Sequence, residues 1–511
     1  MFCKVNTGGI HGIDSFMAGV EVDTSQGLPG FDLVGLLNSE VKESKERVRV
    51  ALKNSGFRLP PQRITVNISP ADIRKEGSAY DLAIAIGILV SMEKLPREVL
   101  EDTLLIGELG LDGRLRPVKG ILPIMLMAKE EGMKQCILPM ENAEEASVVE
   151  GIKTIGVSSL EETIHFFLVE EEKKKSFIFH KKEDENSKLK RQEEGKEEDF
   201  SDIQGQELVK RAAVIAAAGF HHLLILGPPG AGKTMIAKRI PSILPPLSNQ
   251  ESLEVSKIYS VSGLLKQGKS LITTRPFLHP HHTISKQALA GGGRIPRPGV
   301  LSLSHRGILF LDELPEFGRE NIEVLRQPLE DKEVQIARSF GSITYPADIM
   351  LVAAMNPCPC GFFPDRNRCN CSENEIRKYQ NRISGPIYDR IDLCVEAKAI
   401  ELHQLQKPQK QTSSKELKER VLKARSRQLK RYKNTKYLFN SQLEPRDIER
   451  YCHLKEEEKK YMEQIFHSLN LSARGYHRIL KVARTIADLE EAEDIKKVHL
   501  AEAVCYRGLE V

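Results

Sequence analysis

The pattern of apolar and polar positions divides the chain into three regions, and the pattern in each region predicts the kind of domain that it forms. Before residue 170, strand-like apolar runs surround one long helix-like run, which predicts a mixed α/β domain at 1–170. Between 200 and 404, three short apolar runs each end in polar residues, which predicts an α/β core. From 405 to 511 apolar residues recur with the helical period, which predicts a helical domain. The expected elements are 64–68, 80–95, 135–138, 223–226, 307–311, 349–355, 420–432, 456–469 and 473–489.

Residues 171–199 separate the first two regions. They contain nine Lys or Arg and ten Asp or Glu residues, with almost no periodic apolar positions after Phe179. Such a composition has too little apolar surface to bury, so we expect a solvated linker.

Composition narrows the class of protein. A chain of 511 residues with 40% hydrophobic and 29% charged residues is typical of about three globular domains. The longest apolar run lies near 82–90, far short of the roughly 20 residues that cross a bilayer, and the first residues lack a signal pattern. We therefore expect a cytoplasmic protein without a membrane partner. The net charge of +4 is too small to identify a nucleic-acid partner by itself.

The octet GPPGAGKT at 227–234 follows an apolar strand and precedes a helical pattern. Glycines let the backbone N–H groups approach a polyphosphate, Lys233 adds charge at the β- and γ-phosphates, and Thr234 offers a hydroxyl to Mg²⁺. This order predicts a phosphate loop that binds ATP or GTP. The candidate nucleotide-binding residues are Gly227, Pro228, Pro229, Gly230, Ala231, Gly232, Lys233 and Thr234.

Two further strands end in side chains that suit nucleotide hydrolysis. Asp312 and Glu313 follow the apolar run 307–311, where the first acid suits Mg²⁺ and the second suits polarisation of the attacking water. Asn356 follows the run 349–355 and has an amide able to orient the same water. These residues favour hydrolysis over binding alone.

Longer segments give the chain a family resemblance. They are HPHHTISKQALAGGG at 279–293, RPGVLSLSHRGILFLDELPEF at 297–317, LRQPLED at 325–331, AAMNPCPCG at 353–361, SGPIYDRIDL at 384–393 and SARGYHRILKVARTIADLE at 472–490. With them the chain resembles the ComM/YifB family of magnesium-chelatase-like AAA+ ATPases over essentially its whole length. One departure is Val300, where the family usually has Glu after Pro-Gly.

The resemblance implies roles for three residues. Asn356 matches sensor 1, Arg390 matches the arginine finger, and Arg474 matches the sensor-2 residue of the helical lid, with Arg478 as its rival. An arginine finger stabilises the charge that spreads over the γ-phosphoryl oxygens and is often supplied by a neighbouring subunit. The resemblance therefore implies a homohexameric ring. The alternatives are an ion pair of Arg390 with a neighbouring aspartate and a surface position for Arg474.

The first domain resembles the proteolytic domain of Lon protease, in the segments 75–91 and 113–142. That chemistry needs a serine nucleophile and a lysine base. Aligned without gaps, Ala79 stands at the serine and Leu122 at the lysine, while Ser78 and Lys119 are out of register. We expect a non-catalytic domain of the Lon-protease, or ribosomal S5 domain 2-like, fold.

Two clusters of residues are candidates for metal binding. Cys358, Cys360, Cys369 and Cys371 form two C-x-C pairs that suit a tetrahedral structural Zn²⁺, although the usual spacing has two residues between the cysteines and free thiols on a loop are the alternative. The histidines at 279, 281 and 282 are expected to face a pore or to pack, because Pro280 and the family placement do not favour a metal.

Two positively charged segments are candidates for contact with nucleic acid. The stretch 401–436 has twelve Lys or Arg against three Asp or Glu residues, and Arg294 and Arg297 flank a loop rich in Gly and Pro. Such charge suits phosphate backbones, and a solvated helix face is the alternative. With the resemblance, it leads us to expect an ATP-driven DNA motor, a branch-migration helicase acting in natural transformation and recombination. A chelatase-type chaperone that remodels a partner protein is the alternative, and a peptidase is disfavoured.

Overall fold

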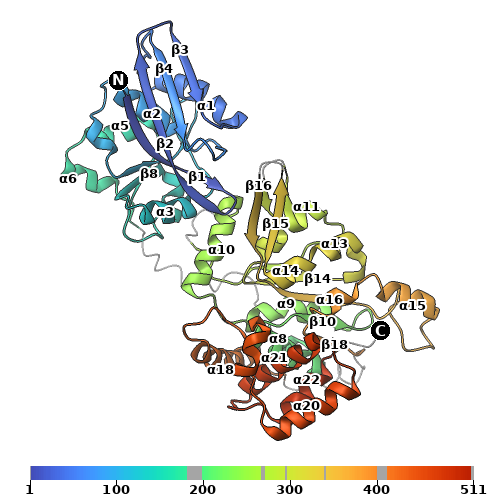
Figure 1. The fold of residues 1–511 in the computed structure, drawn as a ribbon. Coiled ribbons are helices and arrows are strands. Elements are labelled where there is room, and N and C mark those ends of the chain that lie inside the picture. The colour runs from blue at the N-terminus through green and yellow to red at the C-terminus, as the bar shows by residue number, and fades with distance from the viewer. Residues whose placement is uncertain are drawn as a thin grey trace. The chain divides into compact units, whose positions relative to one another are not determined.

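The computed structural model describes residues 2–180, 198–265, 271–293, 296–338, 341–399 and 411–507 (Figure 1). The chain divides into two compact units. The first unit contains residues 1–185, 249–273 and 337–344, and the second contains the rest of the chain. Two segments from the middle of the sequence therefore belong to the N-terminal unit.

The N-terminal unit is built on a seven-stranded sheet in the order β3-β4-β2-β1-β5-β8-β9. The strands are β1 (Phe2–His11), β2 (Asp14–Ser25), β3 (Gly30–Val34), β4 (Arg63–Ser69), β5 (Thr103–Leu105), β8 (Gln135–Pro139) and β9 (Lys153–Val157), with a separate pair β6 (Glu108–Leu109) and β7 (Leu115–Arg116). The β1–β2 and β2–β4 pairs are antiparallel, whereas β3–β4, β1–β5, β5–β8 and β8–β9 are parallel. The helices are α1 (Ser39–Asn54), α2 (Asp81–Ser91), α3 (Ile121–Glu130), α4 (Ala143–Ala146), α5 (Leu160–Leu168), α6 (Glu171–Lys174) and α10 (Asn249–Ser262).

Alternation along the strands builds two apolar cores in this unit. Leu105 and Ile137 point into the cluster that contains α1 and α2, while Leu104 and Leu138 point into the cluster that contains α3. Successive side chains of a strand point to opposite faces of the sheet, so β5 and β8 contribute to both clusters. Every residue of α2 is buried, which explains the long apolar run that follows Asp81.

Helix α10 joins the N-terminal unit through polar contacts. The carbonyl of Ser260 accepts a hydrogen bond from the N–H of Gly120 at 3.1 Å, and its hydroxyl donates to Glu145 at 2.5 Å. Burial raises the pKa of Glu145. The chain beyond α5 also packs on this unit, since the N–H of Phe179 donates to the carbonyl of Thr154 at 2.8 Å. Of the segment expected as a linker, residues 181–197 lie outside the described part.

The second unit is built on a five-stranded parallel sheet in the order β11-β14-β17-β10-β18. The strands are β10 (Leu223–Leu226), β11 (Phe277–Leu278), β14 (Ile308–Leu311), β17 (Met350–Met355) and β18 (Leu393–Glu396). Strand β17 lies between β10 and β14, with Leu226 opposite Met355 and Leu311 opposite Ala353. The chain segments that follow these three strands therefore begin at the same edge of the sheet.

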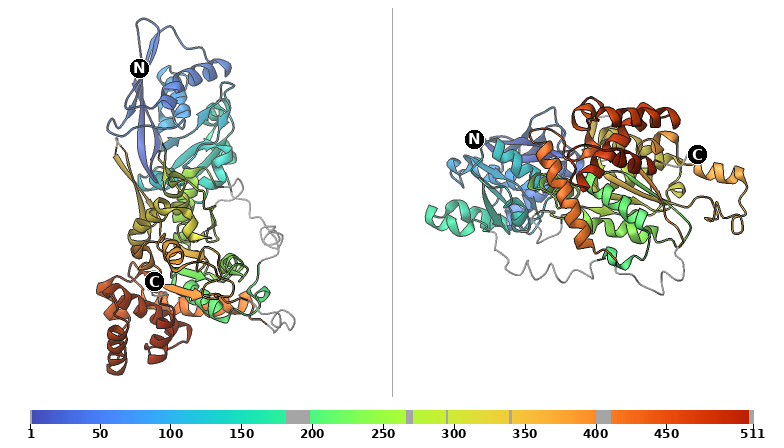
Figure 2. Two further views of the ribbon diagram at one scale, coloured as in Figure 1. Left: turned by 90° about the vertical axis from the view of Figure 1, so that its right-hand side faces the viewer. Right: turned by 90° about the horizontal axis from the view of Figure 1, so that it is seen from below.

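Helices surround this sheet (Figures 1 and 2). Two short hairpins are also present, and residues 337–338 and 341–344 of the second hairpin belong to the N-terminal unit. The helices are α8 (Glu207–Gly219), α9 (Lys233–Ile243), α11 (Lys286–Ala290), α12 (Val300–Leu303), α13 (Arg319–Val324), α14 (Arg326–Asp331), α15 (Glu373–Gln380), α16 (Gly385–Tyr388), α18 (Ser414–Arg431), α19 (Pro445–Tyr451), α20 (Glu456–Ser468), α21 (Ala473–Leu489) and α22 (Lys497–Cys505). The hairpins are β12 (Gly291–Gly292) with β13 (Arg297–Pro298) and β15 (Glu333–Arg338) with β16 (Gly341–Pro346). The nine elements expected from the sequence are all present, with ends that differ by a few residues.

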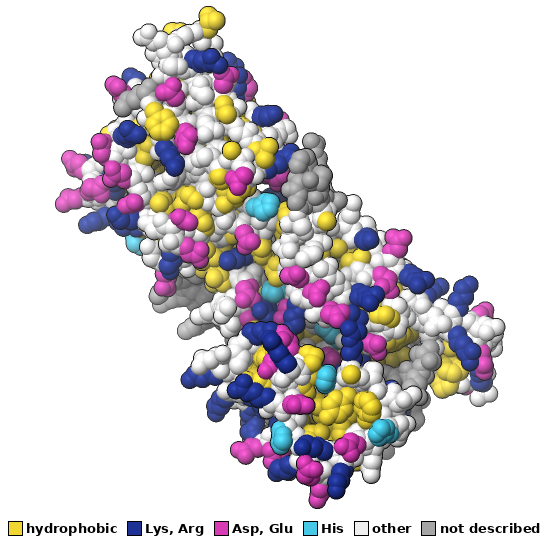
Figure 3. Space-filling model, viewed as in Figure 1, with side chains coloured by type: hydrophobic (Ala, Val, Ile, Leu, Met, Phe, Trp, Pro, Cys, Tyr) yellow, Lys and Arg dark blue, Asp and Glu magenta, His cyan; other side chains and the backbone are white. Residues whose placement is uncertain are grey.

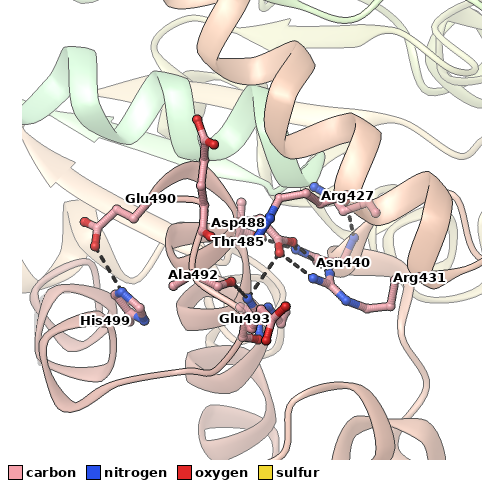
Figure 4. A network of polar contacts seen from close by, with 12 residues as sticks. Arg427, Arg431, Asn440, Thr485, Asp488, Glu490, Ala492, Glu493 and His499 are labelled. Carbon is pink, nitrogen blue, oxygen red and sulfur yellow. Dashed lines mark hydrogen bonds and ion pairs between the residues drawn. The ribbon is translucent and has the colours of Figure 1, made fainter.

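The helical C-terminal region shares one apolar core with the sheet of the second unit. A buried polar network also holds its helices together (Figure 4). Asp488 of α21 is fully buried and accepts hydrogen bonds from Arg431 of α18 at 2.8 Å and from Asn440 at 2.9 Å. Asn440 also donates to Thr485, whose hydroxyl contacts the ring of His221 at 2.8 Å. The network thus extends from the C-terminal helices to His221, two residues before β10.

Among the described residues, none of the helices combines the length and apolar character that crossing a bilayer requires.

Replacement of Asp488 tests the importance of this network for stability. Asp488→Ala leaves the guanidinium of Arg431 and the amide of Asn440 without their buried acceptor, so we expect the free energy of unfolding of the second unit to fall by about 3–5 kcal/mol. Urea unfolding followed by circular dichroism measures the change. Asp494→Ala is the matched control, because Asp494 pairs with Lys455 on the exposed surface at 2.7 Å and its loss should change stability little. Equal stability of the two variants would contradict the prediction.

Candidate nucleotide-binding site

The phosphate loop connects β10 to α9, and its glycines are required by local geometry. A Cβ atom on Gly227 would lie 2.4 Å from the carbonyl oxygen of Ala397, so only glycine fits where the loop passes the end of β18. Gly232 stands at the N-cap of α9 with φ of 82°, in the left-handed region that favours glycine. The loop therefore leads directly into the N-terminus of a helix, where backbone N–H groups and the helix dipole favour an anion.

Lys233 joins the phosphate loop to the neighbouring strand. Its ammonium donates to the carbonyls of Gly227 at 2.7 Å and Pro228 at 2.9 Å, and to the Oδ1 atom of Asn356 at 3.0 Å. Burial lowers the pKa of Lys233, while the nearby carboxylates of Asp312 and Glu313 act in the opposite direction. The lysine thus lies beside the residue expected as sensor 1.

Thr234 and the two acids form the opposite wall. The hydroxyl of Thr234 donates to the Oδ2 atom of Asp312 at 2.6 Å, and the N–H of Glu313 donates to the Oδ1 atom of Asp312 at 3.0 Å. Hydroxyl and carboxylate oxygens of this kind are the ligands that Mg²⁺ prefers. Glu313 has φ of 53° and a side chain that is 59% exposed, with its Oε2 atom 3.8 Å from Nδ1 of His282. Its carboxylate is therefore accessible to water.

These groups line one pocket of about 470 Å³, a size typical of small-molecule sites. The lining residues are Pro229, Gly230, Ala231, Gly232, Lys233, Thr234, Met235, Asp312, Glu313, Met355 and Asn356. Most of the loop residues expected from the sequence line this pocket, and Gly227 and Pro228 contribute carbonyls to Lys233 behind it.

The two arginines expected to contact phosphate lie elsewhere. Arg390 and Arg474 both form ion pairs with the carboxylate of Glu330 in α14, the second at 3.0 Å. Arg390 is only 8% exposed in its side chain and also donates to the carbonyl of Pro386 at 2.5 Å. Arg478 donates to the carbonyl of Ile391 at 2.6 Å. Neither Arg390 nor Arg474 is among the residues that line the pocket of its own chain.

Two residues near the site were not found from the sequence. Gln206 donates to the carbonyls of Ala231 at 3.0 Å and Lys398 at 2.6 Å, which fastens the phosphate loop to the segment after β18. The carboxylate of Glu330 accepts hydrogen bonds from Arg390 and Arg474. The segment 325–331 drew attention to Glu330 only as part of a family resemblance, and a lone glutamine before a helix gives no local signal.

The structure brings the four cysteines of the predicted zinc site together. Their Sγ atoms all lie within 4.8 Å of one another, with Cys358 at 3.3 Å from Cys360 and at 3.7 Å from Cys369. Four sulfurs around a tetrahedral Zn²⁺ at roughly 2.3 Å would stand about 3.8 Å apart. A backbone hydrogen bond from Phe362 lowers the pKa of Cys360, whereas burial raises the pKa of Cys369; thiolate is the form that binds metal. The four cysteines, including Cys371, are arranged as a metal ligand set.

Within the described ranges, no other group of three or more His, Cys, Asp or Glu side chains is arranged to hold a metal ion. The ring of His279 packs against Phe310 at 4.7 Å between centroids, and His281 bonds to Thr283 at 2.9 Å. The histidines at 279, 281 and 282 therefore have packing and polar contacts in place of a shared ligand position.

The N-terminal unit shows what occupies the positions of the Lon-type dyad. Ala79 and Leu122 pack in the apolar cluster around α3. The hydroxyl of Ser78 donates to Glu108, and the side chain of Lys119 lies along Gly263. The serine is thus bonded to a carboxylate and not to a lysine base.

Much of the positive charge of α18 and the following turn is already paired. Arg425 donates to the carbonyl of Leu438, and the other pairs are Arg431 with Asp488, Lys423 with Glu491 and Lys436 with Glu444. Residues 401–410 and Arg294 lie outside the described residues. The charge available to a partner is therefore smaller than the sequence count suggests.

Fold and site together define a class of protein: a phosphate-loop protein with an α/β core, paired acids at the end of another strand of the same sheet, and a C-terminal helical region. Comparison with known proteins agrees with this class. Residues 199–405 match the family described as magnesium chelatase, subunit ChlI; residues 20–142 match subunit ChlI of Mg-chelatase; and residues 411–507 match magnesium chelatase, subunit ChlI C-terminal.

Sequence identity with individual proteins defines the family more closely. Competence protein ComM of Haemophilus influenzae is 42% identical over 501 residues, which cover 98% of this chain and 96% of the relative. The uncharacterized protein YifB of Escherichia coli is 41% identical over 510 residues, which cover 99% and 97%. Lon protease 2 of Bacillus subtilis is 31% identical over 133 residues, which cover 26% of this chain and 23% of the protease.

The chain belongs to the ComM/YifB family of magnesium-chelatase-like AAA+ ATPases. The predicted fold class is confirmed, with Lon-like similarity at the N-terminus, an AAA+ α/β core and a C-terminal helical region. Membership in this family implies ATP and Mg²⁺ as the ligands of the pocket.

Two substitutions separate the expected roles of the pocket residues. Lys233→Ala removes the buried ammonium, and we expect nucleotide affinity to fall by about tenfold or more, because hydrogen bonds to charged groups are the strong ones. Glu313→Gln keeps the shape of the acid but cannot polarise water, so it should bind ATP normally and turn over at least about 100-fold more slowly. Binding of a fluorescent ATP analogue and phosphate release measure the two effects. Normal turnover by both variants would contradict these roles.

Proposed function

We propose that this protein is an ATP-driven DNA motor, a homohexameric ring that migrates DNA branches in the cytoplasm during natural transformation and recombination. The observation that carries the proposal is the convergence of Lys233, Thr234, Asp312 and Asn356 on one pocket. A phosphate cradle, oxygen ligands for Mg²⁺ and a neutral amide at one place are what phosphoryl transfer to water needs.

In this proposal each side chain has one task in hydrolysis. Lys233 would turn from its carbonyl partners to the β- and γ-phosphates, and Thr234 with Asp312 would hold Mg²⁺, which neutralises developing charge on the phosphates. Glu313 polarises the attacking water, since its carboxylate is exposed on the same wall. Asn356 orients that water and contacts Lys233 at 3.0 Å.

The position of Arg390 is our reason for proposing a ring of subunits. Because Arg390 pairs with Glu330 and does not line the pocket of its own chain, the phosphate that it stabilises belongs to a neighbouring subunit. A guanidinium binds carboxylate and phosphate oxygens with the same geometry, so a γ-phosphate can replace Glu330 as the partner. Arg474 shares Glu330 and is proposed as the sensor-2 residue.

DNA is proposed as the partner on the basis of surface charge and relatives. In Figure 3, Lys and Arg side chains gather on the surface where Figure 1 places α18. Lys415, Arg420 and Lys430 of α18 and Lys433 after it are exposed, and Arg297 is exposed on β13. One relative is named a competence protein. These features support contact with phosphate backbones.

A chelatase-type chaperone is the second candidate function. The observation that favours it is that all three family matches carry the name of magnesium chelatase. Such a protein would use the same ATP cycle to remodel a protein partner. Its ATPase activity should respond to that partner and not to DNA.

We also propose that Cys358, Cys360, Cys369 and Cys371 hold one structural Zn²⁺ per chain. The separations of their sulfur atoms support a tetrahedral site.

The arginine finger is tested by mixing variants. Arg390→Ala should leave nucleotide affinity nearly unchanged and slow ATP turnover by about 1000-fold or more, the scale of known arginine fingers. Addition of Lys233→Ala protein should restore part of the activity, because one variant supplies the finger and the other supplies an intact pocket. Phosphate release at several mixing ratios measures this. No recovery in rings shown to be mixed would argue that Arg390 acts within its own chain.

DNA dependence decides between the two candidate functions. We expect DNA to accelerate ATP hydrolysis, and a labelled four-way or three-strand junction to move only with hydrolysable ATP. Because the contacts are to phosphates, binding should weaken steeply with added salt. Glu313→Gln is the control for hydrolysis. ATPase activity that ignores every form of DNA, with the junction left in place, would favour the chaperone.

Zinc content is measured directly. Untagged protein prepared under reducing conditions without chelator should contain one zinc per chain, and Cys369→Ser should lower that content. Elemental analysis is the readout. A stoichiometry near zero in the wild-type protein would remove the site.

A further inference from the structure

The loop that contains the four cysteines contacts the phosphate loop. Gly361, between the two C-x-C pairs, has φ of 84°, and a Cβ atom built on it would lie 2.5 Å from Cδ of Pro229 and 3.7 Å from Cγ of Asn356. The backbone at Gly361 is thus pressed against the ring of Pro229, with no room for a side chain. The cysteine loop forms part of the support of the pocket.

The same loop begins and ends at the pocket. It starts directly after Asn356, and a turn is closed by the N–H of Gly361, which donates to the carbonyl of Cys358 at 3.0 Å. At its far end, Gln380 of α15 donates to the carbonyl of Pro357 at 3.1 Å. Residues 357–380 therefore form a closed excursion whose two ends meet beside sensor 1.

This excursion has very little apolar interior of its own. Its cluster contains only three buried side chains, Cys358, Cys369 and Ile376. The partly buried residues packed against them are Cys360, Phe362, Phe363 and Cys371. Two of the three buried groups are thus thiols of the proposed metal site. A segment with so small a core needs a cross-link or a metal to keep one shape.

We propose that the metal bound by the four cysteines braces the phosphate loop, so that the pocket binds nucleotide tightly only when the metal is in place. This inference rests on the proposed function in two respects, that the four cysteines hold a metal and that the pocket binds ATP. Without the metal, the sulfurs of the two C-x-C pairs are held only by thiol contacts such as those of Cys358 with Cys360 and Cys369, so the loop supports Pro229 through Gly361 less firmly. Sensor 1 is affected too, because Asn356 is two residues from Cys358.

Coupling of this kind acts in both directions. If the metal raises nucleotide affinity by some factor, nucleotide raises metal affinity by the same factor. Zinc should therefore leave the protein more slowly, or at higher chelator concentration, when a non-hydrolysable ATP analogue is bound. This measurement does not depend on catalysis.

The first experiment uses the wild-type full chain. Affinity for a fluorescent ATP analogue is measured in the zinc-loaded protein, after removal of zinc by a chelator, and after zinc is returned. We expect affinity to fall by about tenfold or more without zinc, within the usual range of coupling between sites, and to recover with zinc. Equal affinity in the three states overturns the inference. A zinc-loaded protein that binds no nucleotide contradicts the proposed ATPase itself, so the two failures are distinguishable.

The second experiment alters the contact and leaves the cysteines intact. Gly361→Ala inserts a methyl group against Pro229, and we expect it to keep one zinc per chain while its nucleotide affinity falls. Gly56→Ala is the matched control: Gly56 has φ of 85°, and a Cβ atom there would meet no atom within 4 Å. It adds the same backbone strain in the N-terminal unit and should bind nucleotide like the wild type.

Two results would overturn the inference that the metal supports the phosphate loop. One is unchanged nucleotide affinity in Gly361→Ala with zinc retained. The other is loss of most helical circular dichroism when zinc is removed from the wild type, since that would show general unfolding and not a local effect on the pocket.

Discussion

The order of strands in the parallel sheet is the constraint on which the site depends. Strand β17 lies between β10 and β14, so the segments that follow these strands meet at one edge. The hydrogen bonds from Lys233 to Asn356 and from Thr234 to Asp312 join residues that are 123 and 78 positions apart in sequence. If the order or register of these strands changed, the same residues would be present without forming a site.

The sheet is also tied to the helical lid through buried polar groups. Thr485 of α21 contacts His221, which precedes β10, and the same helix carries Arg474 near its N-terminus. A helix is stiff over this length, and breaking buried hydrogen bonds is costly. A rotation of α21 relative to the sheet that displaced Arg474 would therefore also break the hydrogen bonds around Asp488. This argues that α21 and the start of β10 move together as one body.

Sequence patterns predicted the parts of this protein that are encoded locally. The phosphate loop and the strand ends at Asp312 and Asn356 have fixed spacing and flanking apolar runs, so they could be placed without coordinates. Other features depend on contacts between distant segments. Helix α10 lies in the middle of the sequence yet packs on the N-terminal unit through Ser260 and Gly120, and Glu330 pairs with two arginines from elsewhere in the chain. No hydrophobic periodicity or short sequence motif predicts such contacts between distant segments.

Lys233 of the pocket and the two arginines proposed to contact phosphate share one electrostatic property: each already has oxygen partners within the chain. Lys233 donates to two backbone carbonyls and to Asn356, while Arg390 and Arg474 pair with Glu330. A buried cation without such partners would be costly, so these contacts preserve the site between nucleotides. Phosphate oxygens provide stronger partners of the same kind, and binding would exchange one set for the other. Since the two arginines share a single carboxylate, withdrawal of one changes the charge that faces the other, and the two residues proposed to contact phosphate are thereby linked through Glu330.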